Sequence, residues 1–207
     1  MAGDGSERFV NSYHNERTPP QPGERPEFVA FYEAADELLR EAAELARVVA
    51  RAHQSAAARL FKGDWAQVRK YFSLSEKYAA WGDYRTPATG YGIHAYAHQI
   101  DRPLRLTQAE LEQHPQWRGF GVEAGKHPPM RGWLVAPMIG ADGENYGFIQ
   151  VSDRIEGDFT EQDEAALVRL AKLTSMALGA FARVYVPEFR EMGLRREARE
   201  RSKPSVT

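Results

Sequence analysis

The sequence predicts an α+β fold in which an antiparallel sheet carries two long helices on one face. Apolar residues recur every three or four positions over residues 27–52 and again over 160–185, which is the period of an amphipathic helix. Between these segments, residues 132–139 and 145–152 are two apolar runs joined by a short turn, the pattern of a β-hairpin. Consecutive antiparallel strands with helices at both chain ends are typical of the α+β class.

The first helix is expected to present one apolar stripe over residues 27–52. The stripe keeps a seven-residue repeat, which is also the signature of a seam between two helices. Its members are Phe28, Phe31, Ala35, Leu38, Ala42, Leu45 and Val49. Charged side chains cover the other faces of this helix.

Several short elements are expected in the middle of the chain. Their predicted order is a strand over 53–61, a strand over 69–78, a short helix over 91–99, a short strand over 103–106 and a helix over 107–113. The second of these strands is predicted because polar and apolar side chains alternate along it. Thr107 and Glu110 have the spacing of a capping box, which marks the start of the last helix.

The hairpin and the final helix have the clearest boundaries. Asp142-Gly143 supplies the turn residues between the two hairpin strands. Thr160, with Asp163 three residues later, is expected to cap a helix that runs to Tyr185. The expected buried face of that helix consists of Leu167, Leu170, Leu173, Ala177, Ala180, Phe181 and Val184.

Length and composition indicate one globular domain with two extensions. We expect a disordered tail over residues 1–26, a single domain over 27–186 and a charged tail over 187–207. The formal net charge of −2 gives no reason to expect a nucleic acid or an anionic membrane as partner. The absence of a long apolar run and of a secretory signal favours a cytoplasmic location.

Two short motifs carry a family resemblance. Tyr146-Gly147-Phe148-Ile149 and the run from Phe159 to Asp163 follow an apolar strand and a D-G turn in a fixed order. This order resembles the C-terminal half of GAF domains in bacterial sensor histidine kinases and related signalling proteins. Residues 72–81 are similar to the second strand of the same group, so the resemblance spans residues 27–185.

The resemblance implies both a fold and a type of function. It implies a sheet of about six strands, with the terminal helices on one face and a pocket on the other. A sensory or regulatory domain is expected, one that binds a small ligand or relays a signal to a partner protein. The alternative is a dimerisation or relay module that binds no ligand, because the fold alone does not select a ligand.

The candidate pocket residues come from the middle helix and from the strands. His94 and His98 are four positions apart and would share one helical face, where a pair of imidazoles can hold a metal ion and one can ligate haem iron. No third ligand is evident, so a metal site is not expected, and ordinary packed or exposed histidines remain the alternative. Aromatic residues are the other candidates for the pocket wall, or else simple core residues: Tyr71, Tyr91, Trp133 and Phe148.

The residue content also excludes several activities. The chain has no cysteine, which rules out a covalently attached bilin and the thiol chemistry of methionine sulfoxide reduction. Neither a nucleophile elbow nor a phosphate-binding loop occurs, so we do not expect an enzyme. Haem remains a possible cofactor, and otherwise the ligand is unspecified.

A parallel homodimer built on the terminal helices is the expected assembly, together with an unidentified signalling protein as partner. A first helix of this length would be longer than the sheet is wide. Phe28, Phe31 and Leu38 in its first turns are therefore expected to overhang the sheet and to pack against the C-terminal helix of the same chain and against a second copy, as a four-helix bundle.

Overall fold

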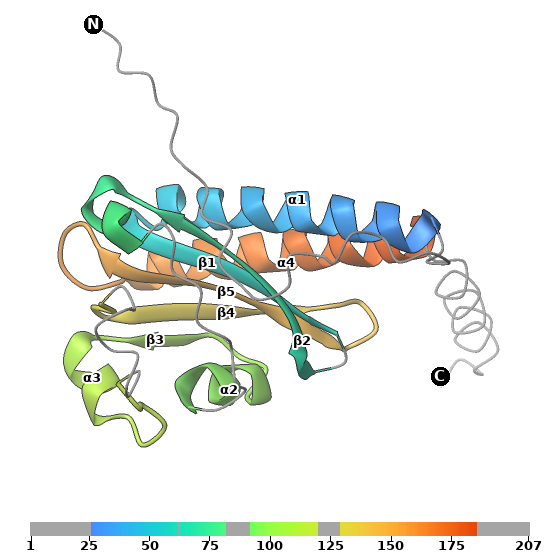
Figure 1. Cartoon of the computed structure of the whole chain (residues 1–207). Coiled ribbons are helices and arrows are strands. Elements are labelled where there is room, and N and C mark those ends of the chain that lie inside the picture. Colours follow the sequence, from blue (N-terminus) through green and yellow to red (C-terminus); the bar gives the residue numbers. More distant parts are fainter. Residues whose placement is uncertain (1–25, 62, 82–91, 120–128, 186–207) are drawn as a thin grey trace, which may run out of the picture.

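The computed structural model describes residues 26–61, 63–81, 92–119 and 129–185 of the chain (Figure 1). Most of both predicted tails lies outside these residues. The elements in chain order are α1 (Pro26–Val49), β1 (Ala52–Phe61), β2 (Asp64–Leu74), the 3-10 helix η1 (Glu76–Trp81), α2 (Gly92–Gln99), β3 (Leu104–Leu106), α3 (Gln108–Gln113), β4 (Trp133–Ile139), β5 (Asn145–Arg154) and α4 (Glu161–Tyr185).

One antiparallel sheet forms the centre of the described structure, which confirms the predicted α+β class. Its strand order is β2-β1-β5-β4-β3. The described residues contain five strands, whereas the family resemblance implied about six. The interior strand β1, between β2 and β5, carries Ala56, Ala57 and Ala58, all fully buried, because other elements cover the sheet there on both faces.

The two faces of the sheet are covered differently. Helices α1 and α4 lie side by side and run in opposite directions across one face, which we call the α1/α4 face (Figure 1). Ala57, Ile149 and Val151 pack there in the largest hydrophobic core. Helix α2 lies on the other face, which we call the α2 face, over a second core that contains Trp133 and Phe148.

Only part of the apolar stripe predicted on α1 is buried. Phe31 is 8% exposed, but Leu45 and Val49 are 49% and 44% exposed. An α-helix has 3.6 residues per turn, so a strict seven-residue repeat drifts by about 20° per heptad. Residues that begin the stripe on the buried face therefore leave it by the end of α1. Other residues complete the buried face there, including Leu39, Ala43 and Ala46.

The first turns of α1 are covered by α4 of the same chain, one of the two partners expected for them. Phe28 and Leu38 are partly buried against the same core that contains Phe31. Phe181 and Tyr185 from the end of α4 pack against this core as well. Helix α4 has 25 residues and α1 has 24, so the neighbouring helix covers the part of α1 that was expected to need a second copy.

The expected buried face of α4 is also wrong at two positions. Leu173 is 64% exposed and Val184 is 73% exposed. Apolar residues occur nearly all round this helix, so more than one stripe can be drawn on it. By length and composition alone, α4 could also cross a membrane, a property that core helices of soluble proteins share. The residues buried inside the fold are Asp163, Leu167, Ala171, Thr174, Ser175, Leu178 and Gly179.

The second predicted strand extends too far toward its C-terminus. Strand β2 ends at Leu74, and the chain turns into η1. Asp153 holds this turn against the end of β5, because its buried carboxylate accepts a hydrogen bond of 2.6 Å from the Tyr78 hydroxyl and forms an ion pair with Lys77. These contacts are distant in sequence, so the local alternation of side chains could not reveal them.

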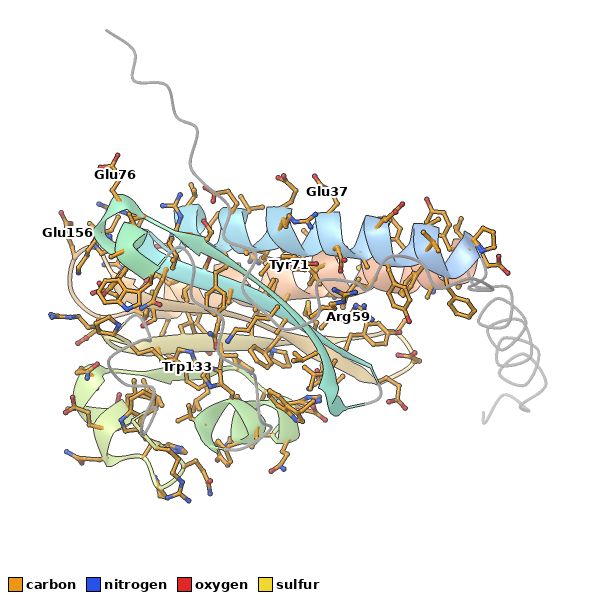
Figure 2. The ribbon with its side chains drawn as sticks, viewed as in Figure 1. Glu37, Arg59, Tyr71, Glu76, Trp133 and Glu156 are labelled. Atoms are coloured by element: carbon orange, nitrogen blue, oxygen red, sulfur yellow. The ribbon has the colours of Figure 1, made fainter. Side chains whose placement is uncertain are left out.

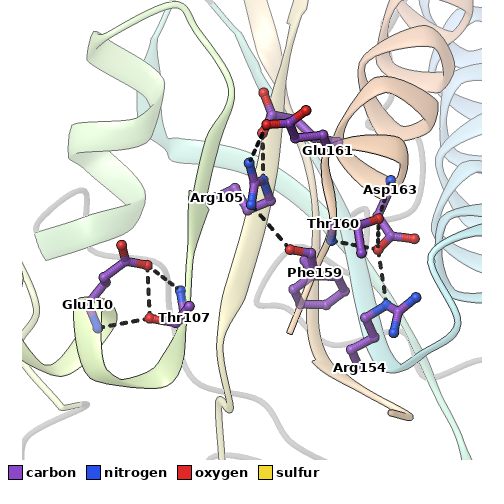
Figure 3. A network of polar contacts seen from close by, with 9 residues as sticks. Arg105, Thr107, Glu110, Arg154, Phe159, Thr160, Glu161 and Asp163 are labelled. Carbon is purple, nitrogen blue, oxygen red and sulfur yellow. Dashed lines mark hydrogen bonds and ion pairs between the residues drawn. The ribbon is translucent and has the colours of Figure 1, made fainter. Parts of the chain in front are cut away.

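Both predicted helix caps are present (Figure 3). The Thr107 hydroxyl accepts a hydrogen bond from the backbone N–H of Glu110, and the Glu110 carboxylate accepts one from the backbone N–H of Thr107. At the start of α4, the Asp163 carboxylate accepts hydrogen bonds from the backbone N–H of Thr160 at 2.8 Å and from Arg154 at 3.0 Å. These pairs fix where the two helices begin.

Gly147 in the Tyr146–Ile149 motif is required by the close pairing of β5 with β1. Its φ is +136°, and a Cβ added there would lie 1.9 Å from the carbonyl oxygen of Ala58. No side chain fits at that distance. The glycine of this motif therefore has a backbone function and is not a ligand contact.

The hairpin turn provides a first test. Gly143 has a φ of +83°, and its N–H donates to the carbonyl of Gly140 at 3.0 Å. No atom lies within 4 Å of an added Cβ, so a substitution changes only the backbone conformational energy. Gly143→Val is expected to cost about 1 kcal/mol or more in urea unfolding, and Gly143→Asn less, since Asn tolerates positive φ. Equal midpoints for the valine variant and the wild type would contradict this account of the turn.

Candidate functional site

Four of the six predicted site residues come together beneath α2. Ile93 and Ala97 of this helix are buried against the sheet, which directs the two histidines toward it. The ring centroid of His94 lies 5.4 Å from that of Trp133 and 6.1 Å from that of Phe148. The predicted association of His94, His98, Trp133 and Phe148 is therefore present as an aromatic cluster.

Trp65 is a member of this cluster that the sequence did not reveal. Its ring lies 6.0 Å from His98 and 6.3 Å from Phe148, between centroids. Trp65 and Val68 belong to the same core although they are three residues apart on β2, which strict alternation does not allow. The ladder between β1 and β2 has an irregularity at Phe61, close to this point. A bulge of this kind cannot be read from a period-2 pattern.

Tyr71 is not part of the cluster. It lies on the α1/α4 face, where it is 3% exposed and packs in the core under α1 (Figure 2). The Arg40 guanidinium lies 4.7 Å from the centre of its ring. Burial and the neighbouring carboxylate of Asp36 raise the pKa of Tyr71. The remaining predicted residue, Tyr91, lies outside the described residues.

The surroundings of His94 and His98 are not those of a metal site. Among the described residues, no three His, Asp or Glu side chains are grouped closely enough to hold a metal ion. The Nδ1 atom of His98 is buried and has no hydrogen-bond partner in this part of the chain. The backbone carbonyl of His98 accepts a hydrogen bond of 2.9 Å from the Asn145 side-chain amide, which anchors the end of α2 to β5.

A small polar cavity lies near the same face. Its volume is about 10 Å³, which is room for one water molecule. Several nearby polar groups already have partners: the Trp133 indole donates to Gln150 at 3.2 Å, and the Gln54 amide donates to the carbonyl of Pro129 at 2.7 Å. The cavity is lined by Gln54, Ser55, Phe72, Met130, Gln150, Val151 and Ser152.

Lys70 adds a buried basic group to the α2 face. It alternates with Tyr71 along β2 and therefore lies on the opposite face of the sheet. The side chain is 6% exposed, and burial lowers the pKa of its amine to about 7. The amine lies 4.7 Å from the centre of the Phe72 ring, a cation–π contact that favours the charged form. At neutral pH the group therefore titrates, unlike an exposed lysine.

The order of elements, the sheet and the cluster beneath α2 can now be compared with known proteins. A family model described as "GAF domain" matches residues 31–179, which is more than half of the chain. The chain belongs to the GAF domain family. The resemblance seen in the two motifs of β5 and α4 is thereby confirmed, and the glycine of the first motif is explained by the pairing of β5 with β1.

Solved structures of GAF domains match the fold. A GAF domain of a phosphoenolpyruvate-protein phosphotransferase from Coxiella burnetii is 21% identical, with a TM-score of 0.53 over 77% of this chain and 92% of that one. The cyanobacteriochrome receptor PixJ is 14% identical, with a TM-score of 0.54 over 72% of this chain and 97% of that one. A free methionine-R-sulfoxide reductase from Thermoplasma acidophilum is 16% identical, with a TM-score of 0.53 over 73% and 96%.

These likenesses show the fold of this GAF domain and leave its ligand open. The matched proteins include sensory domains and one reductase, which illustrates how many functions the fold supports. The sequence contains no cysteine, so thiol redox chemistry is not available to it. No match was found among curated proteins.

Proposed function

We propose that this GAF domain is a non-catalytic sensory or regulatory module that relays a signal through a homodimer. The observation that carries the proposal is the apolar outer surface of the α1/α4 helix layer. Several large apolar side chains on the two helices are 37–73% exposed. They are Leu45, Val48, Val49, Val168, Leu173, Met176 and Val184. We call this set the outer helix surface.

A second copy of the chain is the occupant that the charges of the outer helix surface favour. Helix α1 exposes three acidic residues there, and α4 exposes three basic ones. In a parallel pair with its two-fold axis along the helices, α1 of one copy lies across α4 of the other, so unlike charges meet. The residues concerned are Glu33, Glu37 and Glu41 on α1 and Arg169, Lys172 and Arg183 on α4.

The energetic reason for pairing is the apolar area. Each large aliphatic side chain removed from water contributes about 1.5–3 kcal/mol, before the cost of association. Two antiparallel helices from each copy would then form a four-helix bundle. A change in one copy that tilts α1 or α4 would be transmitted to the other through that bundle.

Light scattering at micromolar concentration tests this proposal. The expected mass is twice the 23.4 kDa of the chain. Co-sedimentation with anionic lipid vesicles is measured in parallel, because α4 is apolar enough to suit a membrane surface as well. A monomer at high micromolar concentration contradicts the homodimer, and a monomer that sediments with vesicles identifies the membrane as the occupant instead.

The α2 face supports a second candidate function, the binding of a small ligand beneath α2. The supporting observation is the buried Nδ1 atom of His98, which lacks a partner in the described structure. A buried polar atom of this kind favours a ligand that can hydrogen-bond to it. Lys70 on the same face would favour a ligand with an acceptor or acidic group.

Hemin is the first probe for this second function. If a histidine of α2 ligates the iron, reconstituted wild-type protein should show a Soret band, and His98→Ala or His94→Ala should remove it, since no cysteine can replace the imidazole. Gln99→Ala, an exposed change on the same helix, is the matched control and should retain the band. A band that survives loss of both histidines contradicts haem ligation here. For other ligands, native mass spectrometry of protein from its own host should show a retained mass that His98→Ala loses.

A further inference from the structure

Arg59 is a buried charged residue on the α1/α4 face, away from the cluster beneath α2. It is 6% exposed, and its guanidinium lies 5.6 Å from the centre of the Phe31 ring and 5.2 Å from that of Tyr32 (Figure 2). Its Nε atom is fully buried without a hydrogen-bond partner. Within the described parts of the chain, no carboxylate lies within ion-pair distance of it.

The groups around Arg59 leave positive charge in excess. Asp36 attracts the guanidinium electrostatically, and Arg69 repels it. Asp36 is itself buried, and its Oδ1 atom has no hydrogen-bond partner. Arg40 lies over the ring of Tyr71 in the same region. Arg40 is paired with the exposed carboxylate of Glu37 at 3.2 Å, so Asp36 is the buried carboxylate that faces Arg59 and Arg69.

The Nε–H group of Arg59 is a buried donor without an acceptor, which is unfavourable because water no longer solvates it. The two aromatic rings compensate only part of this cost, since they offer a π-face and no oxygen acceptor. A planar guanidinium presents its N–H donors as a fork that matches two oxygens of a carboxylate or a phosphate. An oxyanion would supply the oxygen acceptors that the guanidinium of Arg59 lacks.

We propose that the Arg59 cluster, formed by Asp36, Arg40, Arg59, Arg69 and Tyr71, binds a small oxyanion between α1 and the sheet. Arg59 is the principal contact, and Arg40 and Arg69 supply additional positive charge. The site is separate from the candidate pocket beneath α2, because the sheet lies between the two. Binding would join β1 to α1, so the anion would act on the helix layer directly.

Thermal unfolding and titration calorimetry of the full chain test the site, with inorganic phosphate and acetate as separate probes at constant pH and ionic strength. Relative to chloride, at least one probe should raise the unfolding midpoint of the wild type, because an anion that binds only the folded state stabilises it. Phosphate and acetate thereby distinguish a phosphate ligand from a carboxylate ligand. Arg59→Met should abolish the rise, and Arg51→Met, an exposed arginine, should retain it.

Two further variants keep the test decisive if Arg59→Met does not fold. Arg59→Lys retains the charge but loses the fork, so binding should weaken by about tenfold. Asp36→Asn removes the buried negative charge beside Arg59 and should tighten binding by about tenfold, the opposite of what general damage to the fold would produce. The proposal is overturned if neither probe exceeds chloride in the wild type, or if Arg59→Lys and Asp36→Asn bind as the wild type does. The oligomeric state enters none of these readouts.

Discussion

Replacing Leu173 and Met176 together with glutamate is expected to convert the proposed homodimer to a monomer that remains folded. The two side chains are 64% and 57% exposed in the single chain, so their replacement removes little of its own core. In the bundle they would meet the other copy, where two buried carboxylates without partners are strongly destabilising. Light scattering should report a loss of half the mass, and circular dichroism should report unchanged helix content.

The choice of positions on α4 is what makes this experiment informative. The seven-residue stripe of α1 suggests Phe31 as the position to replace instead. Phe31 is buried within one chain, so Phe31→Glu is expected to unfold the protein. Gln162→Glu adds a charge at an exposed position of α4 and serves as the matched control. A double variant that remains dimeric would show that the outer helix surface is not the interface.

The stability of the wild-type domain is expected to rise with pH between about 7 and 9.5 because of Lys70. Burial lowers the pKa of its amine in the folded state to about 7 from 10.5 in the unfolded chain. In this range the unfolded state binds more protons than the folded state, so raising the pH favours folding. The slope can reach about 1.4 kcal/mol per pH unit, or about 3 kcal/mol over the whole range.

Lys70→Met should flatten this dependence, and Arg102→Met, which removes an exposed positive charge away from the outer helix surface, should not. Urea unfolding at several pH values measures the difference. The rise is expected to end near the upper limit of this range. Tyr71, Tyr78 and Tyr146 have raised pKa values in the folded state, so the unfolded state loses these protons first and the stability falls at higher pH. Parallel pH profiles for the wild type and Lys70→Met would contradict the assignment. The contact with the Phe72 ring stabilises the charged amine, so it narrows the pH range and reduces the total change without altering the maximum slope.

The sequence was sufficient for the features that depend on neighbours along the chain. The caps at Thr107 and Thr160 and the turn at Gly143 each involve residues within a few positions, and all three are present. Alternation along β2 correctly separated Tyr71 from Phe72. The alternation did not reveal which face carries α2, because that depends on contacts with distant elements. Tyr71 was therefore predicted as a pocket residue although it lies on the α1/α4 face.

Other features depend on packing that no local pattern encodes. Trp65 joins the cluster beneath α2 through an irregularity in the ladder, and the strict alternation of a strand excludes it. Arg59 lies between Ala58 and Leu60 in β1 and has the spacing of an ordinary strand residue. Only its burial under Phe31 and Tyr32 distinguishes it from an exposed arginine.

The position of β1 between β2 and β5 also affects how the chain folds. Strands β1 and β2 are neighbours in sequence, as are β4 and β5, so each hairpin can form by closing a short loop. The pairing of Ala56 with Gln150 instead joins the two halves of the chain, as does the packing of α4 against α1. Closing so long a loop has a high entropic cost before any contact is gained, which slows folding. A ribosome must therefore release nearly the whole domain before the central strand pair can form, and until then β1 remains an open edge available to chaperones or to other chains.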